Sequence, residues 1–166
     1  MSVPTAAAKS CQKRTDMDKI LHTASAAETE RVGAALAEEK AKDASLPHFI
    51  ALYGDLGVGK TAFVRGFASV FCEGIAVRSP TFALVNEYRG KERTLFHFDM
   101  YRITGEDDLY SIGYDDYLAR DGICLVEWSE NIPFALPDDY LKVTIEKNDA
   151  NCPDSRRISI KKESLC

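Results

Sequence analysis

Several features that mark other protein classes are missing from this chain of 166 residues. Its five cysteines form neither a Cys-x-x-Cys pair nor a set with a His-x₃-His partner spacing, which argues against a zinc site and against a full disulfide framework. Reduced thiols in a cytosol are the simpler interpretation. No apolar run approaches the roughly 20 residues that a membrane helix needs, and the N-terminus lacks the apolar stretch of a secretory signal. We therefore expect a soluble, cytoplasmic protein.

An excess of positive charge is missing as well. The chain has 21 Lys and Arg residues against 26 Asp and Glu residues, which gives a formal net charge of −5 at pH 7. The field of such a molecule repels polyphosphate backbones unless a local basic patch overrides it. Direct, extensive binding of a nucleic acid by this chain alone is therefore not expected.

The length and composition fit one packed domain, with 45% hydrophobic and 28% charged residues. Residues 1–19 contain Lys9, Lys13 and Arg14 but no acidic residue before Asp16. We predict that they form a disordered leader, and a transit peptide is the alternative. Residues 20–166 contain neither an internal repeat nor a linker long enough to divide them, so we assign them to a single domain.

The first half of that domain has the predicted order helix, strand, loop, helix. Ser25 and Glu28 form a capping box, which predicts a helix that runs to about residue 43. Residues 48–53 are a short apolar and aromatic run that predicts a strand, and after Lys60 apolar residues recur with the spacing of a helix. A glycine-rich loop therefore joins a strand to a helix.

The middle of the domain predicts a hairpin and two short helices. Residues 83–88 and 94–98 resemble strands, and the five residues between them suit an antiparallel turn. Residues 105–120 are predicted to be helical in two short pieces that are broken near Gly113. The hairpin implies that the sheet is mixed and not all parallel.

The remaining strands complete the predicted sheet. Residues 123–126 are a continuous apolar run, which is typical of a strand buried on both faces. Residues 141–145 and 157–161 alternate with period two and predict strands that extend the sheet towards its edge. We predict an α/β protein with a P-loop NTPase-like fold, in which helices flank a mixed sheet with a parallel core and an antiparallel hairpin.

The loop before the second helix carries a phosphate-binding motif. The pattern Gly-x-x-x-x-Gly-Lys-[Ser/Thr] is matched without deviation by Gly54-Asp55-Leu56-Gly57-Val58-Gly59-Lys60-Thr61. Glycines let backbone N–H groups wrap around a phosphate, which is also attracted by the positive end of the following helix dipole. Lys60 is predicted to neutralise the β- and γ-phosphate oxygens, and the Thr61 hydroxyl to be a ligand of magnesium. The motif predicts a nucleotide site.

A P-loop protein also needs an acidic residue at the tip of a neighbouring strand, to hold magnesium through its waters. Glu127 closes the buried strand and is the best placed, although a solvated carboxylate at a strand end is the alternative. Asp99 ends the second hairpin strand, where it could orient an attacking water, share the magnesium or form a structural pair with Arg102. His97 on the same strand is more typical of a structural residue.

A hydroxyl in the segment Ser79-Pro80-Thr81-Phe82 is a further candidate. P-loop proteins commonly carry a loop before such a hairpin whose hydroxyl senses the γ-phosphate and magnesium, and Thr81 would supply it. The same residues are equally consistent with ordinary turn chemistry.

Four motifs together, in this order and spacing, resemble the TsaE (YjeE) family of bacterial ATPases. They are Gly-Asp-Leu-Gly-x-Gly-Lys-Thr, Ser-Pro-Thr-Phe, His-Phe-Asp-x-Tyr-Arg and Asp-Gly-Ile-Cys-Leu-Val-Glu-Trp. The likeness covers about residues 23–161. It departs from the family pattern at Ala62, where a second threonine is frequent, and in its longer leader. Neither change removes a group assigned to phosphate or metal.

The resemblance implies weak, magnesium-dependent ATP hydrolysis in a complex with the proteins TsaB and TsaD. That complex forms N6-threonylcarbamoyladenosine at position 37 of tRNA, and the ATPase is thought to reset it between cycles. Carried over by motif, Thr61 and Glu127 hold magnesium, Asp99 supports hydrolysis, and Thr81 and Trp128 lie in the switch-like and acidic-strand motifs. Looser matches suggest that Ser25 and Arg156 border the base or sugar, and ATP is contacted by Leu56, Gly57, Val58, Gly59, Lys60 and Thr61.

Other functions remain as alternatives at this point. A GTPase would normally need an Asn/Thr-Lys-x-Asp segment, which the chain does not contain. A small-molecule kinase would share the P-loop and could use Asp99 to orient an acceptor hydroxyl, but no arginine-rich lid segment follows. A non-catalytic, nucleotide-gated assembly module is the third alternative.

Overall fold

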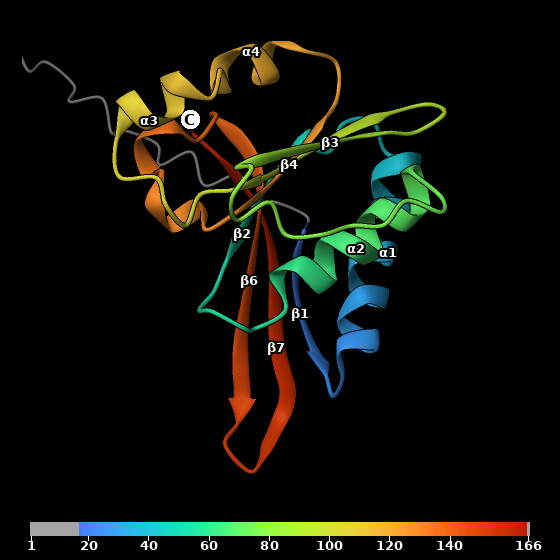
Figure 1. Ribbon diagram of the computed structural model, residues 1–166. Helices are drawn as coiled ribbons and strands as arrows, with labels where there is room; N and C mark the ends of the chain where they lie inside the picture. Colours follow the sequence, from blue (N-terminus) through green and yellow to red (C-terminus); the bar gives the residue numbers. More distant parts are fainter. Residues whose placement is uncertain (1–16, 166) are drawn as a thin grey trace, which may run out of the picture.

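The computed structural model describes residues 17–165 (Figure 1). Residues 1–16 of the predicted leader lie outside this range, and Asp18 and Lys19 belong to strand β1 (Asp18–Thr23). Of the cysteines, Cys11 and Cys166 lie outside the described residues, and the thiols of Cys72, Cys124 and Cys152 are free. In this part of the chain, no helix is long and apolar enough to cross a bilayer.

A seven-stranded sheet forms the centre of the molecule and confirms the predicted mixed α/β fold. The order across the sheet is β1 (Asp18–Thr23), β7 (Cys152–Ser164), β6 (Asp139–Asp149), β2 (Phe49–Tyr53), β5 (Ile123–Glu127), β4 (Thr94–Asp99) and β3 (Val85–Arg89). Strands β6, β2, β5 and β4 are mutually parallel, whereas β1 pairs antiparallel with β7, β7 with β6, and β3 with β4.

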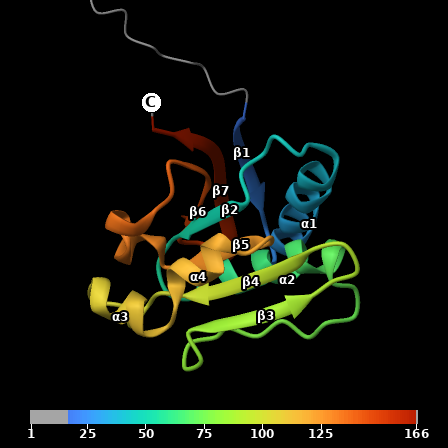
Figure 2. The same cartoon turned by 90° about the horizontal axis from the view of Figure 1, so that it is seen from above.

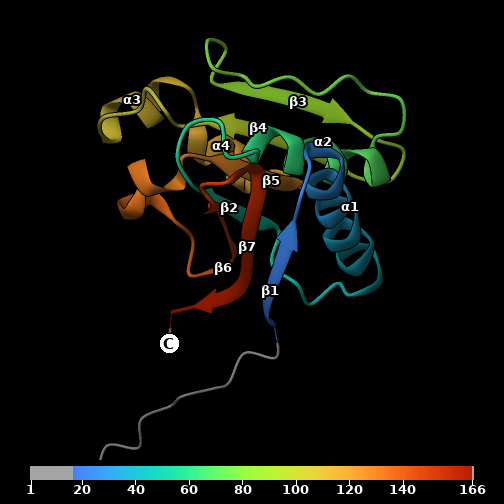
Figure 3. The same cartoon turned by 90° about the horizontal axis from the view of Figure 1, so that it is seen from below.

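Helices cover both faces of the sheet, so that the fold has three layers (Figures 2 and 3). Helices α1 (Ala26–Lys42) and α2 (Lys60–Phe71) pack on one face, where they share a core with the leucine and isoleucine side chains of β2, β5, β6 and β7. The other face is covered by the two short predicted helices and two 3₁₀ turns, namely α3 (Glu106–Ser111), α4 (Tyr114–Ala119), η1 (Ser129–Asn131) and η2 (Pro133–Ala135).

Helix α1 begins at the capping box that the sequence predicts. The Ser25 hydroxyl accepts a hydrogen bond from the backbone N–H of Glu28, and the Glu28 carboxylate accepts one from the N–H of Ala24. Two glycines bring α1 and α2 into backbone contact. A Cβ on Gly33 would lie 2.1 Å from the carbonyl oxygen of Phe63, and one on Gly66 would lie 1.8 Å from that of Glu30. Any side chain at either position would therefore force the helices apart.

The C-terminal hairpin lies towards one edge of the sheet, as predicted, but its strands are longer than predicted and a further strand lies outside them. Strands β6 and β7 extend beyond the alternating segments 141–145 and 157–161, and Figure 1 shows the hairpin projecting past the rest of the sheet. The edge on this side is formed by β1, which the sequence did not predict as a strand. Most residues of β1 are exposed or half-buried, so it has no apolar alternation and pairs with β7 mainly through its backbone.

Candidate nucleotide-binding site

The P-loop joins β2 to α2, as predicted, and forms one wall of a cavity. Gly59, the residue before α2, has a φ of 109°, a left-handed conformation that favours glycine. The N-terminus of the 12-residue helix α2 faces the cavity, because Gly59, Lys60 and Thr61 line it. The cavity has a volume of about 450 Å³, and its lining residues are Leu56, Gly57, Gly59, Lys60, Thr61, Ser79, Thr81, Asp99, Tyr101, Glu127 and Trp128.

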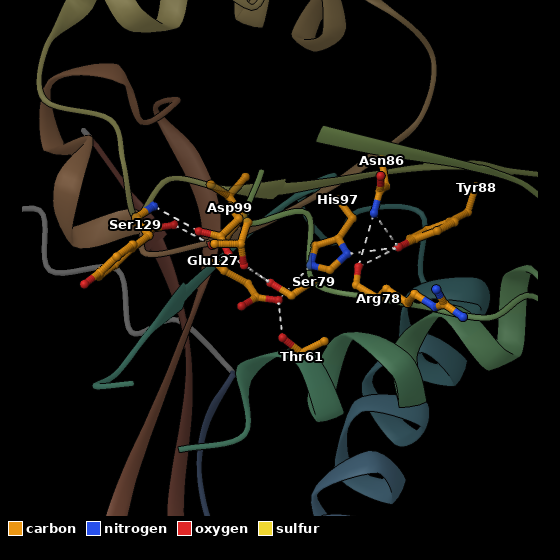
Figure 4. Close-up of polar contacts among 12 residues, drawn as sticks. Thr61, Arg78, Ser79, Asn86, Tyr88, His97, Asp99, Glu127 and Ser129 are labelled. Carbon is orange, nitrogen blue, oxygen red and sulfur yellow. Dashed lines mark hydrogen bonds and ion pairs between the residues drawn. The ribbon is translucent and has the colours of Figure 1, made fainter. Parts of the chain in front are cut away.

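All four sequence motifs thus meet at one place. Parallel strands β4 and β5 end side by side, with Asp99 paired to Glu127 in register, and both residues are 3% exposed. The Thr61 hydroxyl donates to Glu127 Oε1 at 2.9 Å (Figure 4). Because carboxyl ends of neighbouring parallel strands share one edge of the sheet, residues 66 positions apart become direct partners.

The loop before β3 closes the cavity from the side of Asp99. Ser79 Oγ donates to Asp99 Oδ2 at 3.0 Å, and Thr81 Oγ1 donates to the same oxygen at 3.4 Å. The other oxygen, Oδ1, accepts from the backbone N–H of Tyr101 at 3.0 Å. Arg102, which the sequence paired with Asp99 as one alternative, lies with its guanidinium 4.5 Å from the ring centroid of Phe82. The partners of Asp99 are therefore groups that also line the cavity.

Lys60 is almost fully buried, although it carries a charge. Its ammonium group donates to the carbonyl oxygens of Gly54 and Asp55 and lies 4.0 Å from the ring centroid of Trp128. Burial lowers the pKa of Lys60, and the nearby carboxylates of Glu130, Glu127, Asp99 and Asp55 oppose that shift. The ammonium thus has both a π face and several negative charges as neighbours.

Trp128 has a left-handed backbone, with a φ of 59°. A positive φ is uncommon for a residue that is not glycine and costs conformational free energy. The tryptophan ring packs against the ring of Tyr101 at a centroid distance of 4.9 Å. Both residues line the cavity, so the two rings give it an aromatic side.

Three residues that were predicted to contact the nucleotide are not among those that line the cavity. Ser25 caps α1 and is not among the residues that line the cavity. Val58 directs its side chain into the core, where it is 3% exposed, so that only its backbone could meet a nucleotide. Arg156 lies behind the loop, where Nε donates to the Val58 carbonyl at 2.7 Å and Nη2 to that of Gly57 at 3.4 Å. The contacts of Ser25 and Arg156 with base or sugar, and that of Val58 with ATP, remain predictions.

The residues around the cavity fit a polyphosphate with magnesium. A lysine ammonium and a helix N-terminus suit phosphate oxygens, whereas a threonine hydroxyl beside a carboxylate suits a hard cation that prefers oxygen ligands. Thr61 and Glu127 supply such oxygens within hydrogen-bond distance of each other. A slightly larger cavity, of about 490 Å³, lies at the opposite end of α2 from the P-loop.

Sequence reasoning missed Ser79 and Tyr101 as residues of the site. Both lie within two positions of a predicted residue, since Ser79 precedes Thr81 and Tyr101 follows Asp99. Their positions inside motifs that were already assigned to the site could therefore have identified them. The position of His97, which was interpreted as structural, could not be inferred from its strand alone. Its imidazole is fully buried and contacts Glu127.

This fold and site define the chain as a P-loop α/β protein. Residues 23–158 match the model of a family described as "Threonylcarbamoyl adenosine biosynthesis protein TsaE". The chain therefore belongs to the TsaE family.

Individual relatives agree with this assignment. Two proteins named tRNA threonylcarbamoyladenosine biosynthesis protein TsaE are similar to it. The one from Bacillus subtilis is 41% identical over 98 residues, 59% of this chain and 61% of the relative. The one from Haemophilus influenzae is 39% identical over 109 residues, 66% of each. The match thus spans three fifths to two thirds of these relatives. A solved structure, the crystal structure of Bacillus subtilis YdiB, has a TM-score of 0.68 and 30% identity and covers 88% of this chain and 85% of that one.

Proposed function

We propose that this protein binds and hydrolyses ATP with magnesium, and that it acts in the threonylcarbamoyladenosine modification of tRNA together with TsaB and TsaD. The observation that carries the proposal is the meeting of a complete P-loop with Asp99 and Glu127 around one cavity. Membership of the TsaE family supports the pathway. The net charge of −5 supports a role in which tRNA is reached through the complex.

Each side chain has a distinct task in this proposal. Lys60 and the N-terminus of α2 bind the β- and γ-phosphate oxygens. Thr61 would hold magnesium directly and Glu127 through water, and the ion when bound neutralises charge that develops on the phosphates. Asp99, which receives hydrogen bonds from Ser79 and Thr81, orients the attacking water.

The electrostatics of the site support the need for a cation. Four carboxylates lie close enough to raise the pKa of Lys60, namely those of Asp55, Asp99, Glu127 and Glu130. A polyphosphate brought into this field without a cation would meet uncompensated negative charge. Magnesium placed at Thr61 and Glu127 would offset that repulsion. We therefore expect ATP to bind weakly when the metal is chelated.

Phosphate release tests the proposal. The full chain is incubated with MgATP or MgGTP, alone and with TsaB and TsaD, and Lys60→Ala serves as the inactive control. We expect slow release from ATP by the chain alone, because a P-loop site that lacks a group supplied in trans can lose roughly 10³ to 10⁵ in rate. Release should increase with the partners and disappear in the control.

A second variant separates chemistry from binding. Asp99→Asn should keep the affinity for MgATP, because the residue is assigned to water and not to phosphate, but it should reduce phosphate release at least about ten-fold. Tight binding without release by the wild-type chain, with and without the partners, would contradict the ATPase proposal. That result would favour a nucleotide-gated assembly module, or a kinase that lacks its acceptor.

A further inference from the structure

A chain of buried hydrogen bonds leads away from the site across strands β5, β4 and β3. Glu127 Oε1, which accepts from Thr61, also lies 2.7 Å from His97 Nε2. His97 Nδ1 lies 3.2 Å from the hydroxyl oxygen of Tyr88, and that hydroxyl lies 3.2 Å from the carbonyl oxygen of Arg78 (Figure 4). His97 is 0% and Tyr88 7% exposed, so water does not substitute for these contacts.

Strand register explains why these groups line up. Tyr88 is paired with Leu95, and His97 is paired with Leu125, two residues before Glu127. Successive side chains of a strand alternate between faces, so all three polar groups point to the face that α2 covers. Thr61, in the first turn of α2, donates to Glu127 at one end of this chain of hydrogen bonds. The chain therefore connects the P-loop threonine to the backbone of the loop before β3.

The supply of protons limits the direction of the hydrogen bonds. The carbonyl oxygen of Arg78 and the carboxylate of Glu127 accept, whereas the Tyr88 hydroxyl has one proton to donate. Every contact from Glu127 to Arg78 is satisfied when both ring nitrogens of His97 donate, Nε2–H to Glu127 and Nδ1–H to Tyr88, and the Tyr88 hydroxyl donates to Arg78. The Asn86 amide on β3 supports the same end, because its Nδ2 lies 3.2 Å from the Arg78 carbonyl oxygen and 3.4 Å from the Tyr88 hydroxyl. The imidazole then connects the Glu127 carboxylate to the Arg78 carbonyl.

The same loop touches the second carboxylate of the site. Ser79 and Thr81 bond Asp99 on the surface of the cavity, where a bound ion or phosphate would compete with them. The contact between Tyr88 and Arg78 lies behind that surface and is not among the groups that line the cavity. When a ligand displaces the hydroxyls from Asp99, the Arg78 carbonyl can therefore stay in place.

We propose that Tyr88 and His97 are positioning residues that tether the loop at Arg78 to Glu127. The tether would fix one end of the 78–82 loop while Ser79 and Thr81 exchange partners, and it would orient Glu127 towards magnesium. The proposal rests on the proposed function, because it assigns Glu127 to the metal side of a nucleotide site. Neither residue touches substrate in this proposal.

Tyr88→Phe tests the tether, because it removes one hydroxyl and keeps the ring in the core. Tyr114→Phe is a matched control, since Tyr114 is 2% exposed and its hydroxyl donates to the carbonyl of Ala135 at 3.0 Å on the other face of the sheet. Two quantities are measured on the full chain. The first is amide hydrogen exchange of residues 78–84 without nucleotide. The second is the ratio of ATP dissociation constants in EDTA and in magnesium.

We expect Tyr88→Phe to speed exchange in this segment and to reduce the gain in ATP affinity from magnesium, each about five-fold, as one hydrogen bond of ordinary net strength predicts. The affinity in EDTA should stay unchanged, and Tyr114→Phe should alter neither quantity. His97→Gln, which keeps an amide near Glu127 but loses Nδ1, should behave like Tyr88→Phe.

Two results would overturn the tether. In one, Tyr88→Phe resembles Tyr114→Phe in both quantities. In the other, exchange becomes faster but the magnesium gain is unchanged, which would make Tyr88 a structural residue only. If the wild-type chain binds no ATP at all, the proposed function fails separately, and exchange without nucleotide alone decides whether the loop is tethered.

Discussion

The two faces of the sheet are both covered by helices, but they are built from different chemistry. On the face of α1 and α2, His97, Asp99 and Glu127 are buried next to a core in which the strands contribute mainly Leu, Ile and Val side chains and α2 contributes Phe63 and Phe67. On the face of α3 and α4, aromatic rings dominate, and Phe98 packs edge to face against Tyr114 and Tyr117 at centroid distances of 5.6 and 5.3 Å. Buried polar groups cost free energy unless they are paired, whereas such aromatic pairs stabilise.

This contrast indicates that the two faces have different roles. The aromatic face stabilises the fold, and the polar face positions groups for a ligand at some cost in stability. Every described buried side-chain nitrogen or oxygen on either face has a hydrogen-bond partner. The site is therefore preorganised and not left with unpaired groups. Substitutions that lower stability without weakening ATP binding, or the reverse, test whether the two faces have these separate roles.

The largest expected effect is on stability. Phe96 is 0% exposed and packs against Tyr117 at 5.2 Å, away from the cavity. Phe96→Ala should lower the free energy of unfolding by about 3–5 kcal/mol, the usual range for truncation of a buried phenylalanine. Urea denaturation measures the loss, and ATP affinity is measured where the variant is still folded. A weakened ATP affinity in the folded variant would contradict the separate roles of the two faces.

On the polar face, a substitution should weaken ATP binding and leave the stability of the fold almost unchanged. Lys60→Ala should weaken ATP binding about 10- to 100-fold, as the loss of a charged hydrogen-bond partner predicts, with a much smaller change in urea midpoint than Phe96→Ala. Calorimetric titration measures the affinity. Lys142→Ala is the control, because Lys142 also lies over an aromatic ring, 4.7 Å from the centroid of Tyr53, but does not line the cavity. Equal losses in both variants would argue against the phosphate role of Lys60.

A smaller effect should come from the hairpin behind the P-loop. Arg156→Ala removes the donor to the Gly57 and Val58 carbonyls and should weaken ATP binding about three- to ten-fold. Arg157→Ala is a matched control, since its guanidinium instead pairs with Glu146 at 3.2 Å on the surface.

The choice of nucleotide shows how Arg156 acts. If it positions the loop, the affinities for ATP and GTP should fall equally. A loss confined to ATP would instead support the contact with the base that the sequence suggested.

The smallest expected effect is a pH dependence at the outer edge of the sheet. Hydrogen bonds from Arg120 hold the pKa of Glu87 at about 2, below its ordinary value of 4.5. A lowered pKa in the folded protein means that the pair stabilises it above pH 4.5 and that this contribution is lost as the pH falls towards 2.

Glu87→Gln tests the sign of that effect. The variant should be less stable than the wild type at pH 7, by under about 1 kcal/mol because the pair is partly exposed, and the difference should vanish between pH 4.5 and 2. Urea midpoints measured across this range give the difference. A difference that grows with acidity would contradict the assignment.

Local patterns predicted much of the architecture because their causes are local. The capping box at Ser25, the break between α3 and α4 at Gly113 and the strand that ends at Glu127 all depend on neighbouring residues. The β1 strand was missed because its exposed side chains show no periodicity, and its pairing with β7 joins residues more than 130 positions apart.

The sequence by itself determined the P-loop, the α/β class and the identity of the residues assigned to phosphate and metal, because each motif carries its chemistry within a few consecutive positions. Only the tertiary structure decided that Arg156 lies behind the loop, and that Tyr88 and His97 connect Arg78 to Glu127. Such contacts depend on the register between strands and on packing between distant segments, which no local pattern encodes.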